Sequence, residues 1–333
     1  MKKILLSICF MFTAFSLVSC TTGDKKQEII DKKETNENKK DIENKTIKVK
    51  TLNSKKEEIE IEVPINPSKV AVLDMASLDI IDSLGVGDSV VGSANTKIDY
   101  LQKYMNDSVK KLGTIKEADM EAVMSIEPQI IFIGARLAEN YDELSKIAPV
   151  IYLDVNPSDG VLSCTEKNAN IIASIYEKEN KVSELMKSFN SRLKKLNEIS
   201  KDKTAIVGLM TSGSYNVLGK DGRLSLISNE VGFNNIGVDE KIETSRHGNE
   251  VSFEFLLDKN PDYIFVMDRD AAIATEGAKL AKEIMENELI MKTDAYKNGH
   301  IIYLANPAVW YMAEGGIKAL DIMISDLETE LLK

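Results

Sequence analysis

Short apolar runs alternate with amphipathic segments along the chain from residue 46 onward. Runs rich in Val and Ile between turn residues predict buried strands, and apolar residues spaced three or four apart predict helices. Two stretches that alternate apolar and polar residues, 46–50 and 58–63, predict a β-hairpin at the start of the fold. Buried strands are then expected at 69–74, 89–94, 129–135, 150–154, 204–210, 262–268 and 300–305.

Helical patterns separate these strands. They cover 75–85, 117–126, 139–148, 225–232, 250–259, 289–299 and 315–333. Strands that alternate with helices indicate parallel βαβ units with helices on both faces of each sheet. The predicted fold class is therefore α/β.

The segment 163–200 breaks this alternation, because it holds neither proline nor glycine. Its later part, 179–200, carries an apolar stripe at helical spacing and would form a rod of about 33 Å. The stripe consists of Val182, Leu185, Met186, Phe189, Leu193 and Leu196. We therefore expect two Rossmann-like lobes with parallel sheets, bridged by one long helix, with a ligand cleft between the lobes. A single large sheet is the alternative, and the rod argues against it.

Two phrases repeat between the halves of the chain. The stretch "EPQIIFIGAR" at 127–136 resembles "NPDYIFVMDR" at 260–269, and "ELSKIAPVIYLD" at 143–154 resembles "DAYKNGHIIYLA" at 294–305. Without a gap, the first alignment places Glu117, Glu121, Pro128 and Arg136 on Glu250, Glu254, Pro261 and Arg269. The predicted division is an N-terminal lobe at 46–162, a helical segment at 163–201 and a C-terminal lobe at 202–333.

The N-terminus is typical of an export signal. Two lysines precede an apolar run at 4–18, which is too short to span a bilayer comfortably. The run ends in "LVSC", which resembles a bacterial lipobox, so we expect a signal peptide at 1–19 and a lipid on Cys20. An ordinary signal peptide is the alternative. Residues 20–45 are charged and almost free of large apolar side chains, which predicts a flexible tether.

Composition and charge limit the classes of function further. The formal net charge of −11 argues against a general nucleic-acid-binding protein, which needs a basic surface. Cys9 lies in the signal and Cys20 is the expected anchor, so Cys164 has no partner for an internal disulfide. We interpret Cys164 as a small helix residue, because its neighbours show helical spacing and include no histidine.

Arg136 and Arg269 each directly follow an expected strand. Ligands of open α/β sheets bind beyond the carboxyl ends of the strands. If the two lobes face each other, both side chains point into one cleft, which would then hold an anionic ligand. The alternative for either residue alone is an ordinary surface arginine.

Motifs for catalysis and for divalent metals are lacking in the sequence. The stretch "GVGDSVVG" at 85–92 imitates a dinucleotide loop, but its last glycine comes too late for GxGxxG. No GxSxG, P-loop or CxxC motif occurs, and the two histidines, His247 and His300, are few for a zinc or manganese site. We expect a protein that is not an enzyme.

Three stretches of the second half resemble the class III periplasmic binding proteins. They are "RHGNEVSFEFLLDKNPDYIFVMDRD", "NELIMKTDAYKNGHIIYL" and "PAVWYMAEGG". The resemblance is greatest to the branch that captures ferric catecholate siderophores for ABC transporters. It covers residues 46–333 and is more specific in the C-terminal lobe.

This resemblance implies the site residues. Three arginines of the family surround the ferric catecholate, and the matching positions are Arg136, Arg223 and Arg269. Some members also ligate Fe(III) with a histidine and a tyrosine, which match His247 and Tyr311. Without the resemblance, His247 is a solvated loop residue and Tyr311 a core residue. The motif around Arg223 is shorter than the family's usual run, and Arg246 stands where a smaller residue is usual.

The resemblance also implies partners. One glutamate per lobe, here Glu121 and Glu254, docks on the permease dimer, whereas the alternative for both is stabilisation of a helix N-terminus. The predicted protein is a monomeric lipoprotein on the outer face of the cytoplasmic membrane or in the periplasm, anchored through Cys20. It has no permanent cofactor, binds a ferric siderophore, and closes with little hinge motion. Haem, cobalamin or a hydroxamate siderophore are alternative ligands, and an enzyme or a structural lipoprotein is a remote alternative.

Overall fold

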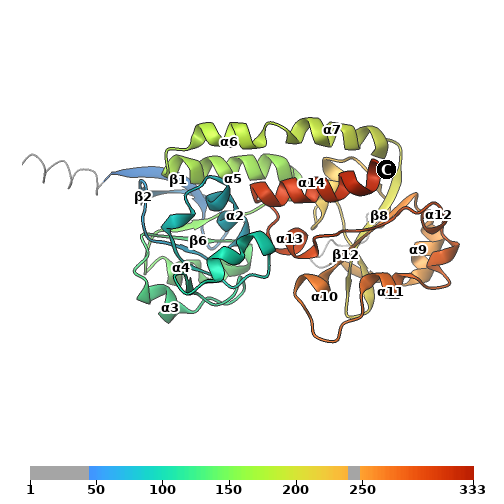
Figure 1. Ribbon diagram of the computed structural model, residues 1–333, viewed down its shortest axis with the longest axis horizontal. Coiled ribbons are helices and arrows are strands. Elements are labelled where there is room, and N and C mark those ends of the chain that lie inside the picture. Colours follow the sequence, from blue (N-terminus) through green and yellow to red (C-terminus); the bar gives the residue numbers. More distant parts are fainter. Residues whose placement is uncertain (1–44, 239–247) are drawn as a thin grey trace, which may run out of the picture. The chain divides into compact units, whose positions relative to one another are not determined.

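The computed structural model describes residues 45–238 and 248–333, so Cys20 and His247 lie outside the described residues. Residues Thr46–Lys333 form one compact unit. It opens with the expected antiparallel hairpin of β1 (Thr46–Leu52) and β2 (Glu58–Pro64) (Figure 1). The buried Thr51 hydroxyl fixes the hairpin to the first lobe, since it accepts a 2.7 Å hydrogen bond from the Tyr152 N–H and donates to the Tyr152 carbonyl at 3.2 Å.

The N-terminal lobe contains a five-stranded, fully parallel sheet in the order β5-β4-β3-β6-β7. Every residue of strands β3, β6 and β7 is buried, because other segments of the chain cover both faces of the sheet there. The strands are β3 (Val70–Val72), β4 (Val90–Ser93), β5 (Lys110–Lys111), β6 (Ile130–Ile133) and β7 (Val150–Tyr152). The α-helices and 3₁₀-helices (η) between them are α2 (Met75–Ser83), η1 (Gly87–Ser89), η2 (Asp99–Met105), α3 (Met120–Ser125), η3 (Ala135–Asn140), α4 (Tyr141–Leu144) and η4 (Pro157–Asp159).

The C-terminal lobe contains a second sheet in the order β11-β9-β8-β12-β13, with β10 beside the start of β8. Alternate residues of β8 enter different cores: Val207 and Leu209 join the core shared with the N-terminal lobe, whereas Ile206 and Met210 join a smaller core on the other face. The strands are β8 (Thr204–Thr211), β9 (Ser214–Val217), β10 (Asn234–Asn235), β11 (Asn249–Val251), β12 (Tyr263–Asp268) and β13 (Ile301–Tyr303). The helices are α8 (Ser225–Asn229), α9 (Phe253–Lys259), α10 (Arg269–Ala272), α11 (Ala281–Met285), η5 (Ile290–Lys292), α12 (Asp294–Lys297), α13 (Pro307–Met312) and α14 (Ile317–Leu331).

This second sheet is mixed, so the prediction of parallel sheets is wrong for it. Strand β9 runs antiparallel to β8 because Ser212 (φ 51°) and Gly213 (φ 85°) form a tight turn in the left-handed region. Strand β11 is also antiparallel to β9, and its last two residues, Glu250 and Val251, lie in the stretch expected to be helical. Helix α9 begins only after Ser252, whose hydroxyl caps it by accepting from the Phe255 N–H.

The expected rod at 179–200 is interrupted. Helices α6 (Glu179–Met186) and α7 (Phe189–Ser200) are separated by Lys187 and Ser188, although both keep helical backbone angles. The hydrogen bond from the Lys187 N–H to the Glu184 carbonyl shows a local tightening of the helix. The apolar stripe nevertheless faces the core as expected, with all its members buried except the half-buried Leu185.

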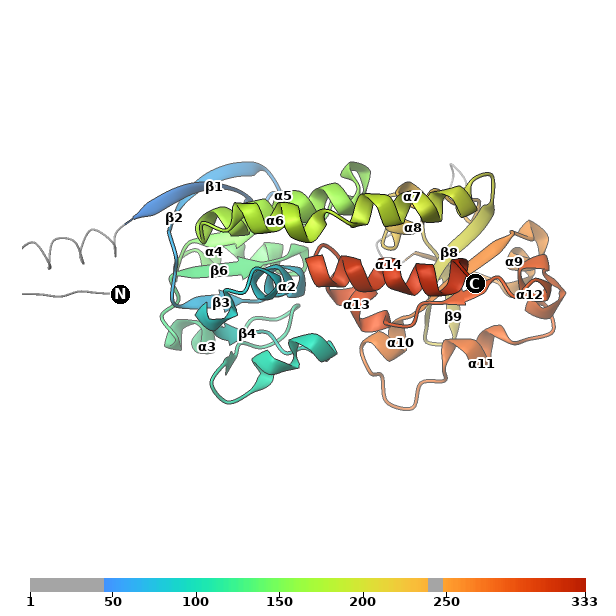
Figure 2. The same cartoon turned by 45° about the horizontal axis from the view of Figure 1, so that its top comes forward.

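Two helices pack beside this rod and connect the lobes. Figure 2 shows α5 (Val161–Ile175) and α14 alongside α6 and α7. Arg192 of α7 fixes α14 in place, since its guanidinium donates to Asp321 at 2.6 Å and to Glu328 at 2.7 Å. Charged partners of this planar group constrain the register of the two helices.

The N-terminus of α14 is capped by a side chain from the other lobe. Asp79 of α2 is buried and accepts 2.8 Å hydrogen bonds from the backbone N–H groups of Lys318 and Ala319. It also accepts a 2.5 Å hydrogen bond from the Tyr100 hydroxyl. A side chain at Gly316 would meet Asp79, because its Cβ would lie 2.5 Å from the Asp79 Cγ. Burial raises the pKa of Asp79 to about 6, against the opposing effect of its hydrogen bonds.

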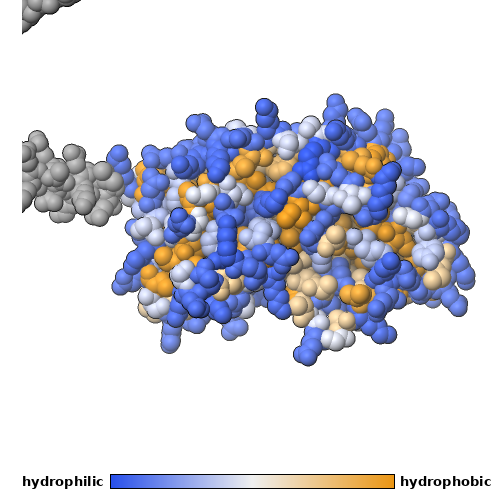
Figure 3. Space-filling model, in the orientation of Figure 1, coloured by the Kyte–Doolittle hydropathy of each residue, from blue (hydrophilic) through white to orange (hydrophobic). Residues whose placement is uncertain are grey.

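No helix within the described ranges is long and apolar enough to cross a membrane. The face in Figure 3 mixes hydrophilic and hydrophobic side chains. Met124 on α3 and Leu280 before α11 are large hydrophobic residues that are more than half exposed.

Replacing Asp79 with alanine is expected to lower the free energy of unfolding by about 1–3 kcal/mol, because the first turn of α14 loses its cap and the Tyr100 hydroxyl its acceptor. The folded-state pKa of Asp79 lies above its ordinary value of 3.8, so the stabilisation is complete at low pH and decreases as pH rises toward about 6. The measurement is denaturant unfolding at pH 4 and pH 7. Ser83→Ala is the control, since it removes one 3.3 Å hydrogen bond from Asp79. Equal stability of Asp79→Ala and wild type at both pH values would contradict the capping role.

Candidate ligand-binding site

Arg136 enters the site from the N-terminal lobe. It follows β6 at the start of η3, where Gly134 allows the chain to pass close to Asp74. A Cβ at Gly134 would lie 2.4 Å from an Asp74 oxygen, so no other residue fits there without movement. The Arg136 Nη2 atom donates a 2.9 Å hydrogen bond to the Tyr311 carbonyl.

Arg269 enters the site from the C-terminal lobe at the equivalent position. It follows β12 as the first residue of α10, which Asp268 caps through the Ala271 N–H. The Arg269 Nε donates to the Tyr311 hydroxyl at 3.2 Å, and its Nη1 donates to Thr211 at 2.9 Å. The strand-end positions predicted from the repeat therefore bring both arginines to one residue, Tyr311.

Arg223 is the third member of this group. It precedes Leu224, whose left-handed backbone (φ 63°) turns the chain into α8. The Arg223 Nη1 donates a 2.9 Å hydrogen bond to the same Tyr311 carbonyl that Arg136 contacts. The Cζ atoms of Arg136, Arg223 and Arg269 lie 5.4, 4.5 and 5.6 Å from the centre of the Tyr311 ring. This arginine cluster thus surrounds one aromatic side chain.

Tyr311 lies in α13 and is only 2% exposed. Burial by itself raises the pKa of the phenol, but the hydrogen bond from Arg269 and the charges of the three arginines outweigh burial. The pKa of Tyr311 is therefore lowered from its ordinary value of 10. This arrangement therefore stabilises the phenolate form of the side chain.

Three guanidinium groups this close repel one another. From their distances to the ring, no two Cζ atoms are more than about 11 Å apart, so each pair repels by at least about 1.5 kcal/mol at an effective dielectric constant of 20. The carbonyl and the ring of Tyr311 are dipolar partners without a net charge. Asp270 is a carboxylate at 3.8 Å from Arg269. An anion placed against the cluster would relieve the repulsion.

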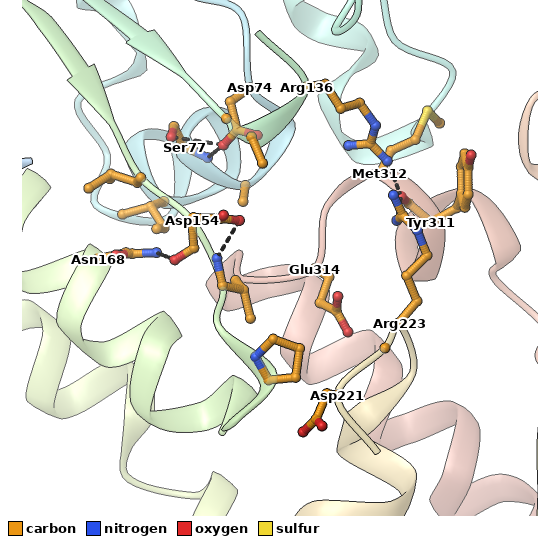
Figure 4. A pocket seen from close by; sticks show the side chains of 18 residues that line it. Asp74, Ser77, Arg136, Asp154, Asn168, Asp221, Arg223, Tyr311, Met312 and Glu314 are labelled. Carbon is orange, nitrogen blue, oxygen red and sulfur yellow. Dashed lines mark hydrogen bonds between the residues drawn. The ribbon is translucent and has the colours of Figure 1, made fainter. Parts of the chain in front are cut away.

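A cavity of about 120 Å³ lies beside the cluster, between segments of both lobes. Figure 4 shows Asp74, Asp154 and Asn168 on one side and Arg223, Glu314 and Asp221 on the other. Arg136 and Tyr311 also line it, whereas Arg269 contacts Tyr311 from outside the lining.

Sequence reasoning missed the acidic residues of this cavity. Asp74 and Asp154 come shortly after β3 and β7, the two strands that flank β6, so the strand-end rule used for Arg136 could have found them. Asp74 accepts 2.8 and 2.9 Å hydrogen bonds from the Ser77 N–H and hydroxyl, and burial raises its pKa despite these bonds. Glu314 follows no strand, and no sequence signal marks it.

A second hollow of about 710 Å³ lies between the β1–β2 hairpin and α5. It shares Asp154, Asn168 and Asp221 with the first cavity but is lined by lysines and by no arginine. Cys164 also borders it, and burial raises the pKa of this thiol, so the residue is an unreactive part of α5 as the sequence indicates. Among the described residues, no cluster of three or more His, Cys, Asp or Glu could hold a metal ion.

Glu121 and Glu254 each lie 15 residues before an arginine of the repeat and occupy equivalent structural positions. Each is the second residue of a helix, α3 or α9, and each is exposed. Asp119 and Ser252 cap the two helices. The repeat therefore extends to the caps, and both carboxylates are also well placed to stabilise a helix N-terminus.

Comparisons with known proteins agree with this fold. The petrobactin-binding protein YclQ of Bacillus subtilis (strain 168) is 34% identical over 302 residues, which cover 87% of this chain and 93% of that protein. Its crystal structure matches with a TM-score of 0.79, covering 87% of this chain and 99% of the other. The catecholate-siderophore-binding protein VctP of Vibrio cholerae is 29% identical with a TM-score of 0.77, covering 85% of this chain and all of that one.

A more distant relative is the ferric-anguibactin-binding protein FatB of Vibrio anguillarum (strain ATCC 68554 / 775). It is 27% identical over 78% of this chain and 81% of that protein. These relatives are binding proteins rather than enzymes. Another relative is named as a substrate-binding lipoprotein of an ABC transporter, and this name implies that the relatives act outside the cytoplasm. With a match to the family model over residues 70–308, the chain belongs to the periplasmic binding protein family.

Proposed function

We propose that this protein captures an anionic ferric siderophore of the catecholate type and delivers it to the permease of an ABC importer. The arginine cluster around Tyr311 carries the proposal. Guanidinium groups remain charged at physiological pH and donate several hydrogen bonds, which suits the oxygens of a ferric catecholate. The names of YclQ and VctP, which bind petrobactin and catecholate siderophores, support this ligand class.

Capture requires a change in the contacts of the arginines. Ligand pockets for compounds of siderophore size usually measure about 300–1,000 Å³, whereas the cavity beside the cluster measures about 120 Å³. The arginine side chains must therefore leave the Tyr311 carbonyl, or the lobes must separate slightly. The shared core and the α7–α14 connection oppose a large rotation, so side-chain exchange is the main event in this proposal.

Delivery requires contact with the permease and retention at the membrane. In this proposal Glu121 and Glu254, one on each lobe, contact the two permease subunits, and a lipid on Cys20 holds the protein on the outer face of the membrane. The exposed, equivalent positions of the two glutamates support their part. The protein acts as a monomer, with the siderophore as cargo and without a permanent cofactor.

Arg136→Gln and Arg269→Gln are each expected to weaken binding of a ferric tris-catecholate by about 10–100-fold, because each removes a charge-assisted hydrogen bond of about 1.5–3 kcal/mol. The measurement is quenching of Trp310, the only tryptophan. Lys282→Gln removes an exposed charge from the same lobe as Arg269 and is the control. Unchanged affinity in both arginine variants would exclude the cluster as the binding site, and quenching by haem or cobalamin alone would favour the alternative ligands.

Tyr311→Phe is expected to abolish the phenolate-to-iron charge-transfer band of a bound ferric bis-catecholate, since two bidentate catechols leave two positions of the octahedron open. His247→Ala is expected to shift that band, and neither change should alter the spectrum of a tris-catecholate complex. The measurement is visible absorption of the loaded proteins. Identical bis-catecholate spectra in wild type and both variants would exclude direct ligation by Tyr311 and His247.

Reversing both docking charges, Glu121→Arg with Glu254→Arg, is expected to leave the Kd for the siderophore unchanged and to lower iron uptake at least about tenfold, because like charges at an interface cost several kcal/mol. Uptake of labelled iron by cells that depend on this protein is the measurement. Glu184→Arg with Glu198→Arg, on exposed positions of α6 and α7, is the matched control. Normal uptake by the first variant would rule out these glutamates as docking residues.

A further inference from the structure

Glu314 is a buried acidic residue beside the arginine cluster. It follows α13 and lines the same cavity as Arg136 and Arg223 (Figure 4). Its Oε1 atom is inaccessible to solvent and has no hydrogen-bond partner within the described part of the chain. A buried carboxylate oxygen without a donor is costly, so the residue needs an explanation beyond packing.

Charged groups from several elements face Glu314. The cations are Arg223, which precedes α8, and Arg136 of η3, and both attract its carboxylate. Glu230, at the end of α8, repels it. The remaining titratable groups that line the cavity are Asp74, Asp154, Asp221 and Tyr311.

We propose that Glu314 sets the charge that the arginine cluster offers to its ligand. When ionised, its carboxylate offsets one guanidinium charge, and when protonated, it leaves that charge to the anionic ligand. This role rests on the proposed binding of an anionic ferric complex by the same cluster. It makes Glu314 a specificity-determining residue, because the discrimination between more and less highly charged complexes depends on its protonation.

The environment of Glu314 places its titration in the physiological range. Burial raises the pKa of its carboxyl to about 7, although Arg223 opposes the shift, and Glu230 adds to it. An anionic ligand at the cluster favours the protonated form further, so binding is accompanied by proton uptake. Above pH 7, wild type should therefore bind a highly charged anionic complex more weakly than a variant that cannot ionise at this position. Below pH 7, the two proteins should bind it about equally.

The test is Glu314→Gln, which keeps the size of the side chain and remains neutral. The ligand is a ferric tris-catecholate, and the readout is the ratio of the wild-type Kd to the variant Kd at pH 6 and pH 8. Dividing the two constants cancels the titration of the ligand and of other protein groups. We expect a ratio near one at pH 6 and a roughly tenfold advantage of the variant at pH 8, equivalent to one unit of pKa coupling.

Asp221→Asn is the matched control, since it removes an exposed carboxylate from the rim of the same cavity. Its ratio is expected to be the same at pH 6 and pH 8. If the ratio for Glu314→Gln also stays the same at both pH values, the proposal is overturned.

A second measurement does not depend on the ligand. The folded-state pKa of Glu314 lies above its ordinary value of 4.5, so wild type loses stability relative to Glu314→Gln as pH rises toward about 7. The variant should therefore unfold a few degrees higher at pH 8 and at a nearly unchanged temperature at pH 4.5. Equal shifts of the unfolding temperature at both pH values would exclude ionisation of Glu314. A pH-dependent shift of this temperature without any binding of ferric catecholates would instead reject the proposed function.

Discussion

The site depends on one interaction, the contact of three guanidinium groups with Tyr311. Arg136 comes from one lobe, and Arg223 and Arg269 come from the other. Tyr311 therefore joins the two halves of the fold at the point where positive charge is concentrated. The carbonyl, hydroxyl and ring of Tyr311 are dipolar contacts of the arginines, and Asp270 is a carboxylate at 3.8 Å from Arg269. The arginines are therefore gathered at one place before an anion binds, and in the proposed function they exchange the Tyr311 carbonyl for the ligand.

The helices behind the site explain why the lobes can maintain this contact. Asp79 of the N-terminal lobe caps α14, and Arg192 ties α14 to α7, so the C-terminal helix is fixed to elements of both halves. The core is continuous across these helices. Flexible hinge strands would allow wide closure, whereas packed helices restrict it. In the proposed function, ligand entry therefore depends on long arginine side chains, which can move without a rearrangement of the backbone.

Much of this architecture could be predicted from the sequence, for identifiable reasons. Apolar runs gave the positions of the parallel strands, and the repeat placed Arg136 and Arg269 at equivalent strand ends. Strand β9 was missed although Ser212-Gly213 is a turn signal between two apolar stretches. The interruption at Lys187 and Ser188 has no breaker residue to reveal it. Glu314 could not be found at all, because its importance arises only from groups that are distant in the sequence.

The charge of the whole molecule and the charge of the site have opposite signs. A net charge of −11 would repel an anionic complex at long range, but at physiological ionic strength exposed charges are screened beyond about 8 Å. The complex therefore experiences mainly the groups that line the site. Long-range steering then contributes little to its association, and in the proposed function selection occurs in the cavity that Arg136, Arg223 and Glu314 line. A chain that is acidic overall can thus retain an anion, provided that its few arginines converge.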